Sequence, residues 1–173
     1  MSLEQASYLS QVIAALAVLA SLVFVGLQIR QNTQSQKIVA VSSLAAAIAA
    51  INVPAMQSPA LGEALAKAMR DWNSATREQR VLAHFFLFSY FKLAENAWYQ
   101  HSRGVLDTTQ WTGWETMLRA FYHSAGVQNG WWPRRRRAYS PEFQAFLAGA
   151  PKPPDDIGAL EDIFGASAPG EAP

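Results

Sequence analysis

The feature that most limits what this chain can fold into is an uncharged apolar run near its N-terminus, YLSQVIAALAVLASLVFVGLQI at residues 8–29. A helix that spans a bilayer needs about 20 mainly apolar residues, and this run has that length. Tyr8, Gln11 and Gln28 lie near its two ends, where polar and aromatic side chains suit the membrane interface. The sequence therefore predicts a transmembrane helix over residues 8–29, preceded by a short leader at residues 1–7.

A cleaved signal peptide is the alternative for the same segment. Such a peptide has a basic leader, a shorter apolar stretch and a small-x-small cleavage site. Here the leader MSLEQ contains Glu4 and no basic residue, and the run ends in GLQIRQNTQ, so we expect an uncleaved anchor. Arg30 and Lys37 follow the run, and basic residues stay on the cytoplasmic side. We therefore expect a single-pass protein of the inner (cytoplasmic) membrane with its C-terminal domain in the cytoplasm.

Small residues form one stripe of the predicted span: Ser10, Ala14, Ala17 and Ser21. Their spacing of three and four places them on one helical face. Small side chains let helices pack closely in lipid, so we expect a second transmembrane helix as partner, in a homo-oligomer or a membrane complex. Chance in an alanine-rich span is the alternative.

The helical pattern continues beyond the span. No Pro or Gly occurs between Arg30 and Pro54, so the simplest prediction is one long helix that runs from the membrane into the domain. The apolar stretch Ile38–Ile51 raises a second possibility, a transmembrane hairpin with its turn at residues 31–37. Fourteen residues are short for a span, so we favour the continuous helix.

Start and stop signals divide the rest of the chain into helices. Ser58 before Pro59 and the Thr76–Gln79 pair are typical N-terminal signals, and Gly104 is a typical C-terminal one. The predicted helices cover residues 59–72, 77–103, 108–122, a short basic stretch opened by WWP at 131–133, and 141–149. Without sustained strand alternation, the fold class is all-α: a transmembrane helix followed by a helical bundle at residues 30–149.

Residues 150–173 change in composition to Pro, Gly and Asp, which predicts a disordered tail. Within the tail, a short acidic amphipathic helix is conceivable as a docking motif, formed by Ile157, Leu160, Ile163 and Phe164. So short a helix is not stable alone, so a solvated tail is the simpler expectation.

Several segments together resemble a widespread group of bacterial membrane-anchored helical proteins to which no activity is assigned. They are LVFVGLQIRQNT, LAENAWYQHSRGVLD, Trp111 with Trp114, and GWWPRRRRAYSPEF, within residues 8–148. The resemblance implies a single-pass anchor and a helical bundle. This chain departs from the pattern in the more apolar Ile38–Ile51 and in Arg134–Arg137, which lacks the acidic residues usually mixed into that stretch.

Composition excludes several kinds of chemistry. The chain has no cysteine, which excludes disulfides, thiolate metal sites and cysteine nucleophiles. Its net charge of +1 lacks the basic excess of a nucleic-acid-binding protein. No phosphate-binding loop, G-x-S-x-G or HExxH motif is present. His84 and Glu95 would lie about 16 Å apart on one helix, too far to share a metal ion. We therefore expect no catalysis, no metal and no cofactor.

Two groups of polar residues stand out in the bundle. The helix at residues 77–103 is apolar on most faces yet carries a predicted buried polar stripe: His84, Lys92, Glu95, Asn96 and Tyr99. Charged residues are seldom buried unless paired, so we expect Glu95 to be buried and hydrogen-bonded to a basic or amide group. Lys92 lies at helical-neighbour spacing, and a residue of another helix such as Arg119 is an alternative partner. The stripe most simply fixes how the helices pack.

The second group is a predicted membrane or partner surface: Trp131, Trp132, Arg134, Arg135, Arg136 and Arg137. Tryptophan and arginine both suit a membrane interface, and anionic lipid attracts basic residues. An acidic partner, conceivably the chain's own tail, and a solvated face are the alternatives.

These features predict a membrane-anchored helical interaction protein, an accessory or scaffold component of a membrane complex. The alternative is a module that binds a lipid or small amphiphile in an aromatic pocket. A roomy apolar cavity would favour the carrier, and a filled core would favour the scaffold.

Overall fold

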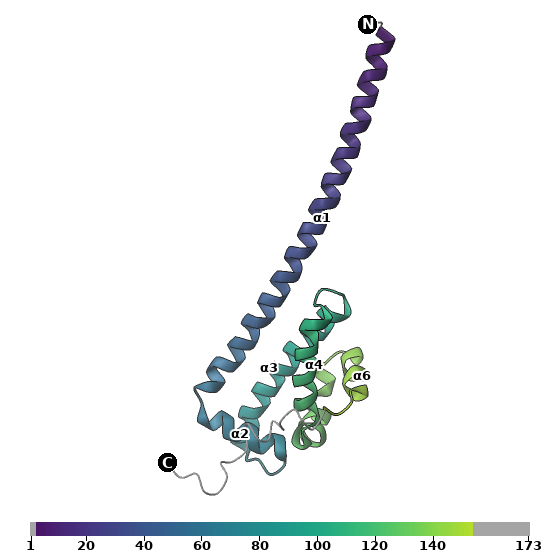
Figure 1. Ribbon diagram of the computed structural model, residues 1–173. Coiled ribbons are helices and arrows are strands. Elements are labelled where there is room, and N and C mark those ends of the chain that lie inside the picture. The colour runs from purple at the N-terminus through teal and green to yellow at the C-terminus, as the bar shows by residue number, and fades with distance from the viewer. Residues whose placement is uncertain (1–2, 154–173) are drawn as a thin grey trace. The chain divides into compact units, whose positions relative to one another are not determined.

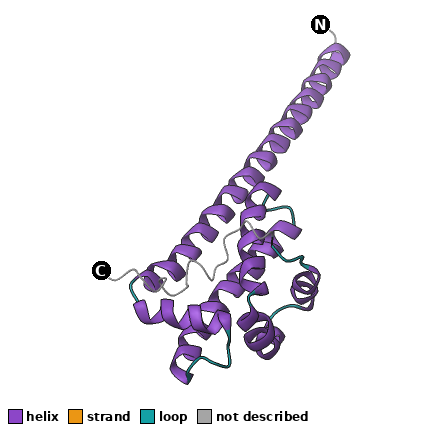
Figure 2. Cartoon of the chain, turned by 60° about the horizontal axis from the view of Figure 1, so that its bottom comes forward, coloured by secondary structure: helices purple, strands orange, loops and turns teal. Residues whose placement is uncertain are grey.

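The computed structural model describes residues 3–153, and over this range the fold is all-α (Figure 2). Every regular element between Leu3 and Pro153 is a helix, and no strand occurs there. The predicted disordered tail and its short amphipathic helix fall at residues 154–173, outside the described residues.

The first helix, α1, runs without a break from Leu3 to Met56, over 54 residues. The continuous helix was the favoured prediction, and the hairpin alternative is wrong because residues 31–37 form no turn. The chain divides within α1 into two compact units, residues 1–39 and the part that begins at Ala40. The second unit thus begins ten residues later than the domain start predicted at residue 30.

The first unit is a single helical segment whose apolar side chains are open. From Val12 to Ile29 the large apolar side chains are between 47% and 64% exposed. None of the most apolar 18-residue window of α1 is buried, and the helix is long and apolar enough to cross a membrane. Ser10, Ala14, Ala17 and Ser21 are all exposed on it. The hydroxyl of Ser21 donates to the carbonyl of Ala17 at 2.8 Å, which satisfies its polar group within the helix.

The second unit consists of the last turns of α1 and a bundle of shorter elements (Figure 1). The α-helices of the bundle are α2 (Pro59–Arg70), α3 (Arg77–Ser102), α4 (Thr108–His123), α5 (Trp132–Arg135) and α6 (Pro141–Gly149). Two short turns complete it, the π-helical η1 (Val127–Trp131) and the 3-10 turn η2 (Arg136–Ala138). These helix bounds agree with the predicted ones to within two residues, η1 and η2 excepted.

The predicted start and stop signals form the expected caps. Ser58 accepts from the backbone N–H of Leu61, and Thr76 and Gln79 form a reciprocal capping box at the start of α3. The side chain of Asp107 caps α4 by accepting from the backbone N–H of Gln110. Gly104 ends α3 with a φ of 70°, a backbone conformation that favours glycine.

The core of the bundle forms around α3, whose Leu87 and Phe91 are fully buried. Leu44, on the part of α1 within this unit, is only 2% exposed and packs into the same core, with Ile48 and Ile51 against it. Packing on the bundle therefore accounts for Leu44, Ile48 and Ile51 of the stretch that had suggested a second span, whereas Ile38 and Val39 are 60% and 66% exposed.

Two glycines let η1 approach α2 more closely than any other residue would allow. A Cβ added to Gly126 would lie 1.9 Å from the carbonyl oxygen of Ala68. A Cβ added to Gly130 would lie 2.2 Å from the Cβ of Trp72. This close approach seats the fully buried Trp131 beside Trp72 and brings α5 next to the start of α3.

Candidate functional site

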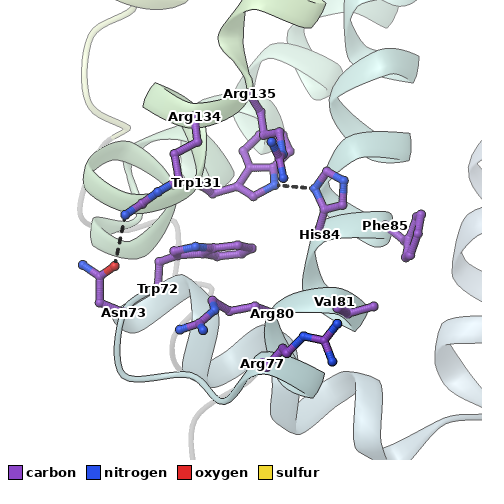
Figure 3. A pocket seen from close by; sticks show the side chains of 10 residues that line it. All are labelled: Trp72, Asn73, Arg77, Arg80, Val81, His84, Phe85, Trp131, Arg134 and Arg135. Atoms are coloured by element: carbon purple, nitrogen blue, oxygen red, sulfur yellow. Dashed lines mark hydrogen bonds between the residues drawn. The ribbon is translucent and has the colours of Figure 1, made fainter.

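One hollow on the bundle is a groove of about 570 Å³ between the α2–α3 turn, α3 and the η1–α5 segment (Figure 3). We call it the arginine groove. Its lining residues are Trp72, Asn73, Arg77, Arg80, Val81, His84, Phe85, Trp131, Arg134 and Arg135. Four of them are arginines and none is acidic, so the groove is cationic with an aromatic lining.

Two indole rings form the inner part of this groove. Trp72 follows the C-cap of α2 and is 8% exposed, and Trp131 ends η1 and is fully buried. The Nε1–H of Trp131 donates to Nδ1 of His84 at 3.1 Å, which joins η1 to α3. A His84 ring that accepts at Nδ1 carries its proton at Nε2 and is neutral. Burial, aided by the positive charge of Arg135, lowers the pKa of His84 and favours this neutral form.

The four arginines flank these rings from two sides, Arg77 and Arg80 from α3 and Arg134 and Arg135 from α5 (Figure 3). Arg80 donates to the carbonyl of Ala75 at 2.8 Å, which fixes its position. Arg134 donates to the carbonyl of Gly130 and, at 3.4 Å, to Oδ1 of Asn73. Within residues 3–153, none of these four guanidinium groups forms an ion pair with a carboxylate.

Arginine clusters without carboxylate partners suit anionic ligands. A guanidinium presents a planar fork of donors that matches carboxylate and phosphate oxygens. Four of them in one concave site attract a ligand that carries several negative charges, and the indole, Val81 and Phe85 surfaces can hold apolar groups next to those charges. The described residues contain no cluster of three His, Asp or Glu side chains that could hold a metal.

A second polar cluster, here called the Glu95 cluster, joins α3 to α6. It consists of Lys92, Glu95, Tyr139 and Ser140. Lys92 Nζ donates to Oε2 of Glu95 at 2.8 Å and lies 4.5 Å from the centre of the Tyr139 ring. The backbone N–H of Ser140 donates to Oε1 of Glu95 at 2.6 Å. Desolvation by itself would raise the pKa of Glu95, but the bonds from Lys92 and Ser140 outweigh it, so this pKa lies below its ordinary value.

The structure divides the predicted polar stripe. Lys92, Glu95, Asn96 and Tyr99 line one shallow hollow of about 280 Å³, whereas His84 lines the arginine groove. The hydrogen bond expected between Glu95 and Lys92 is present.

The expected burial of the stripe is wrong for two residues. Asn96 and Tyr99 are exposed, because this face of α3 is covered only where the start of α6 crosses it, at Lys92 and Glu95. Glu95 itself is half-buried, and Arg119 pairs with Glu115 on its own helix rather than with Glu95.

The predicted tryptophan–arginine surface also divides. Trp131 and Trp132 are 0% and 6% exposed, so placing them on a membrane surface was wrong. Both rings pack on Phe91, at centroid distances of 5.1 and 5.6 Å. Their burial follows from the close packing of η1 against α2. The arginines of the run are exposed, as predicted, but only Arg134 and Arg135 line the groove, while Arg136 and Arg137 belong to η2.

Sequence reasoning missed six of the ten lining residues, namely Trp72, Asn73, Arg77, Arg80, Val81 and Phe85. One signal was present. Arg77 lies in the first turn of α3, where the helix dipole favours acidic residues, and Arg80 follows three positions later on the same face. Their meeting with Arg134 depends on the Gly126 and Gly130 contacts, which no local pattern reveals.

Comparison of the chain with protein-family profiles, with curated proteins and with solved structures finds no match. Functional inference therefore depends on the residues themselves. Three features carry it: the exposed apolar segment of α1, the aromatic core around α3 and the arginine groove.

Proposed function

We propose that this chain is a membrane-anchored, non-catalytic helical interaction protein that serves as an accessory or scaffold component of a membrane complex. The observation that carries the proposal is the exposed apolar surface of the first unit. Residues 12–29 present an apolar side chain on every face of the helix, each about half exposed or more. Soluble proteins rarely expose so continuous an apolar surface, and lipid covers it without cost.

The packed aromatic core supports an interaction role over that of an amphiphile carrier. Phe91, Trp131 and Phe143 are fully buried, and their rings contact further aromatic rings around them. The arginine groove opens at the surface and carries four arginines among its ten lining residues, unlike the enclosed apolar pocket that a lipid tail requires.

Flanking charge and the small-residue stripe support the remaining parts of the proposal. Arg30 and Lys37 favour a cytoplasmic second unit and an inner-membrane location, because basic residues stay on the cytoplasmic side. Ala14 and Ala17 leave room for the close approach of another transmembrane helix, from a second copy or from a partner.

Resistance of the full chain to alkaline carbonate extraction from bacterial membranes tests the anchor. The double variant Val18→Arg/Leu22→Arg places two charges near the middle of the span, each costing about 2.5–3.5 kcal/mol in a bilayer. We expect this variant to move to the soluble fraction. The matched control Ala45→Arg/Ala49→Arg adds the same charges at exposed positions of the second unit and should stay in the membrane.

Extraction of the unmodified chain would contradict the anchor. Loss of the Ala45→Arg/Ala49→Arg control from the membrane would show that the second unit also enters the bilayer.

A phosphatase that is active only in the periplasm, fused to the C-terminus, tests the orientation. It should stay silent, and strong activity would contradict the cytoplasmic location.

A further inference from the structure

The charge of the chain is unevenly divided. Residues 40–153 contain 12 basic and 7 acidic side chains, a net charge of +5. Residues 154–173 contain 5 acidic side chains and no basic one, a net charge of −5. The near-neutral total therefore conceals a basic bundle followed directly by an acidic segment of equal and opposite charge.

We propose that the arginine groove is a docking site for an acidic, partly apolar peptide segment, and that the segment it binds is residues 155–164 of the same chain. The proposal goes beyond the proposed membrane role and does not depend on it. Two independent properties of the groove match those of the segment. One is the sign and number of the charges, and the other is the mixture of charged and apolar groups.

The groove offers cations that are not engaged elsewhere. Arg77 and Arg135 form no hydrogen bond or ion pair within the described residues, whereas Arg80 and Arg134 are held by backbone carbonyls. The acidic segment offers Asp155, Asp156, Glu161 and Asp162. A carboxylate bound by a guanidinium gains strong, charge-assisted hydrogen bonds, and the fork geometry selects it.

The groove also offers apolar surface that the described residues leave exposed. Phe85 is 65% exposed and Val81 is 46% exposed, and both belong to the outer rim of the groove, where the Phe85 ring points away from the two indoles (Figure 3). The segment carries its apolar residues at spacings of three and four: Ile157, Leu160, Ile163 and Phe164. A peptide in which acidic pairs alternate with apolar residues can thus pair with the arginines and, at the same time, cover Val81 and Phe85.

The segment can reach the groove. The carbonyl of Ala150 accepts from Nε2 of His123 at 3.0 Å, so the chain leaves the bundle beside α4. The seven steps from Pro153 to Leu160 span up to about 23 Å when extended. His123 ends α4 and stands eight positions before Trp131 of the groove, and the residues between them are largely helical, so the groove lies within this reach.

A peptide fits the groove better than a lipid surface does. The arginines come from two separate helices and surround a hollow, whereas a bilayer presents a flat array of headgroups. Trp131 and Trp132, which would have anchored the Arg134–Arg137 run to a membrane interface, are buried in the core. Arg136 and Arg137, which complete the basic run, lie outside the groove.

Covalent attachment makes even a weak contact effective. A short flexible tether gives an effective concentration on the order of 1 mM. A segment with a dissociation constant of about 100 µM would then occupy the groove about ten-elevenths of the time, and an added competitor would bind about ten-fold more weakly.

The test uses a fluorescent synthetic peptide of residues 154–173 and the chain in an uncharged detergent, with binding followed by fluorescence anisotropy. We expect the peptide to bind a chain that ends at Pro153, and to bind the full chain roughly ten-fold more weakly because the tethered segment competes. Binding should weaken as salt increases from 50 to 500 mM, because screening reduces the attraction between exposed charges.

A matched pair of variants of the chain ending at Pro153 locates the site. Arg77→Gln/Arg135→Gln removes the two unengaged groove arginines and should weaken peptide binding roughly ten-fold or more. Arg136→Gln/Arg137→Gln removes the same charge outside the groove and should weaken binding by less than about three-fold. Both pairs are exposed, so the unfolding midpoint should not change in either variant.

Equal affinity of the peptide for the full and the shortened chain would overturn the proposal, as would equal losses in the two double variants. A peptide with all four carboxylates of residues 155–162 replaced by amides should not bind, and unchanged binding would also overturn it. Vesicles of neutral and of anionic lipid provide the remaining arm. Binding to anionic vesicles that depends on Arg77 and Arg135, without peptide binding, would assign the groove to lipid instead.

Discussion

Oε1 of Glu95 on α3 accepts a hydrogen bond from the backbone N–H of Ser140, the N-cap residue of α6, at 2.6 Å and across 45 positions of the chain. Lys92 completes the contact, because its Nζ binds Oε2 of Glu95 and the carbonyl of Ala138. One carboxylate thus joins the middle of α3 to the start of α6. Phe143 and Leu147 of α6 are fully buried, so this contact holds the last helix over the core.

The first prediction concerns the stability that Glu95 contributes. Glu95→Ala removes two hydrogen bonds to a charged acceptor, leaves the backbone N–H of Ser140 unpaired and leaves Lys92 with the carbonyl of Ala138 alone, so we expect a loss of about 2–3 kcal/mol. Asn96→Ala, at the exposed neighbouring position, should change stability by less than about 0.5 kcal/mol. Thermal unfolding of the full chain in detergent, followed by near-ultraviolet circular dichroism, measures both. Equal melting temperatures for the two variants would show that the contact contributes nothing.

How far the sequence determines the structure depends on the range of the interactions. Ser58 and the Thr76–Gln79 pair act within one helical turn, and each of these caps was identified from its neighbours alone. The Lys92–Glu95 pair is also local, at a spacing of three residues.

Longer-range relationships were missed or wrong. Trp131 and Trp132 precede four arginines, and that local context favoured a surface position. Their burial depends on contacts with Phe91, about 40 residues earlier in the chain. The arginine groove likewise depends on residues far apart in the chain, such as Arg77 and Arg135. The packing of η1 on α2 brings their two segments together.

The second prediction tests that packing. In Gly126→Ala, the new Cβ would meet the backbone carbonyl oxygen of Ala68 at 1.9 Å, and backbone cannot move aside as a flexible side chain can. We expect a loss of about 3 kcal/mol or more, because overpacking forces backbone shifts. Gly113→Ala is the matched control. A Cβ added at Gly113 meets no atom beyond its own helical turn within 4 Å, and Gly113 is exposed within α4. It should stabilise the helix by up to about 1 kcal/mol.

The unfolding midpoint of the two glycine variants in urea provides the measurement. An unchanged urea midpoint in Gly126→Ala would mean that η1 does not approach α2 closely at this position. The arginine groove would then lack the support that places Trp131 and Arg134.

The third prediction concerns the Tyr90 hydroxyl, which lies in the core between α3 and α4. Tyr90 is 4% exposed, its ring lies 4.5 Å from that of Phe121, and its hydroxyl has no hydrogen-bond partner among the described residues. Burial raises the pKa of this hydroxyl above its ordinary value. An unpaired buried polar group costs about 1–3 kcal/mol, so Tyr90→Phe should raise stability by about 1 kcal/mol. A lower melting temperature for Tyr90→Phe would reveal a partner for the hydroxyl.

The last prediction concerns the pH dependence of stability near the arginine groove. The pKa of His84 lies below its ordinary value of 6.5 in the folded chain, through burial first and the charge of Arg135 second. The unfolded chain therefore binds a proton at this residue more readily than the folded chain does. The stability from neutral His84 is fully present above pH 6.5 and is lost as the pH falls through the folded pKa.

Protonation at Nδ1 also removes the acceptor for Trp131, so acid should loosen the contact between η1 and α3. We expect the urea midpoint of the full chain to fall between pH 7.5 and about 5.5. His84→Asn supplies an amide oxygen as acceptor without a titrating group, and it should reduce this fall. Arg135→Gln should reduce it as well, because it removes the repulsion of the imidazolium. An identical pH dependence in the unmodified chain and in His84→Asn would show that other groups control it.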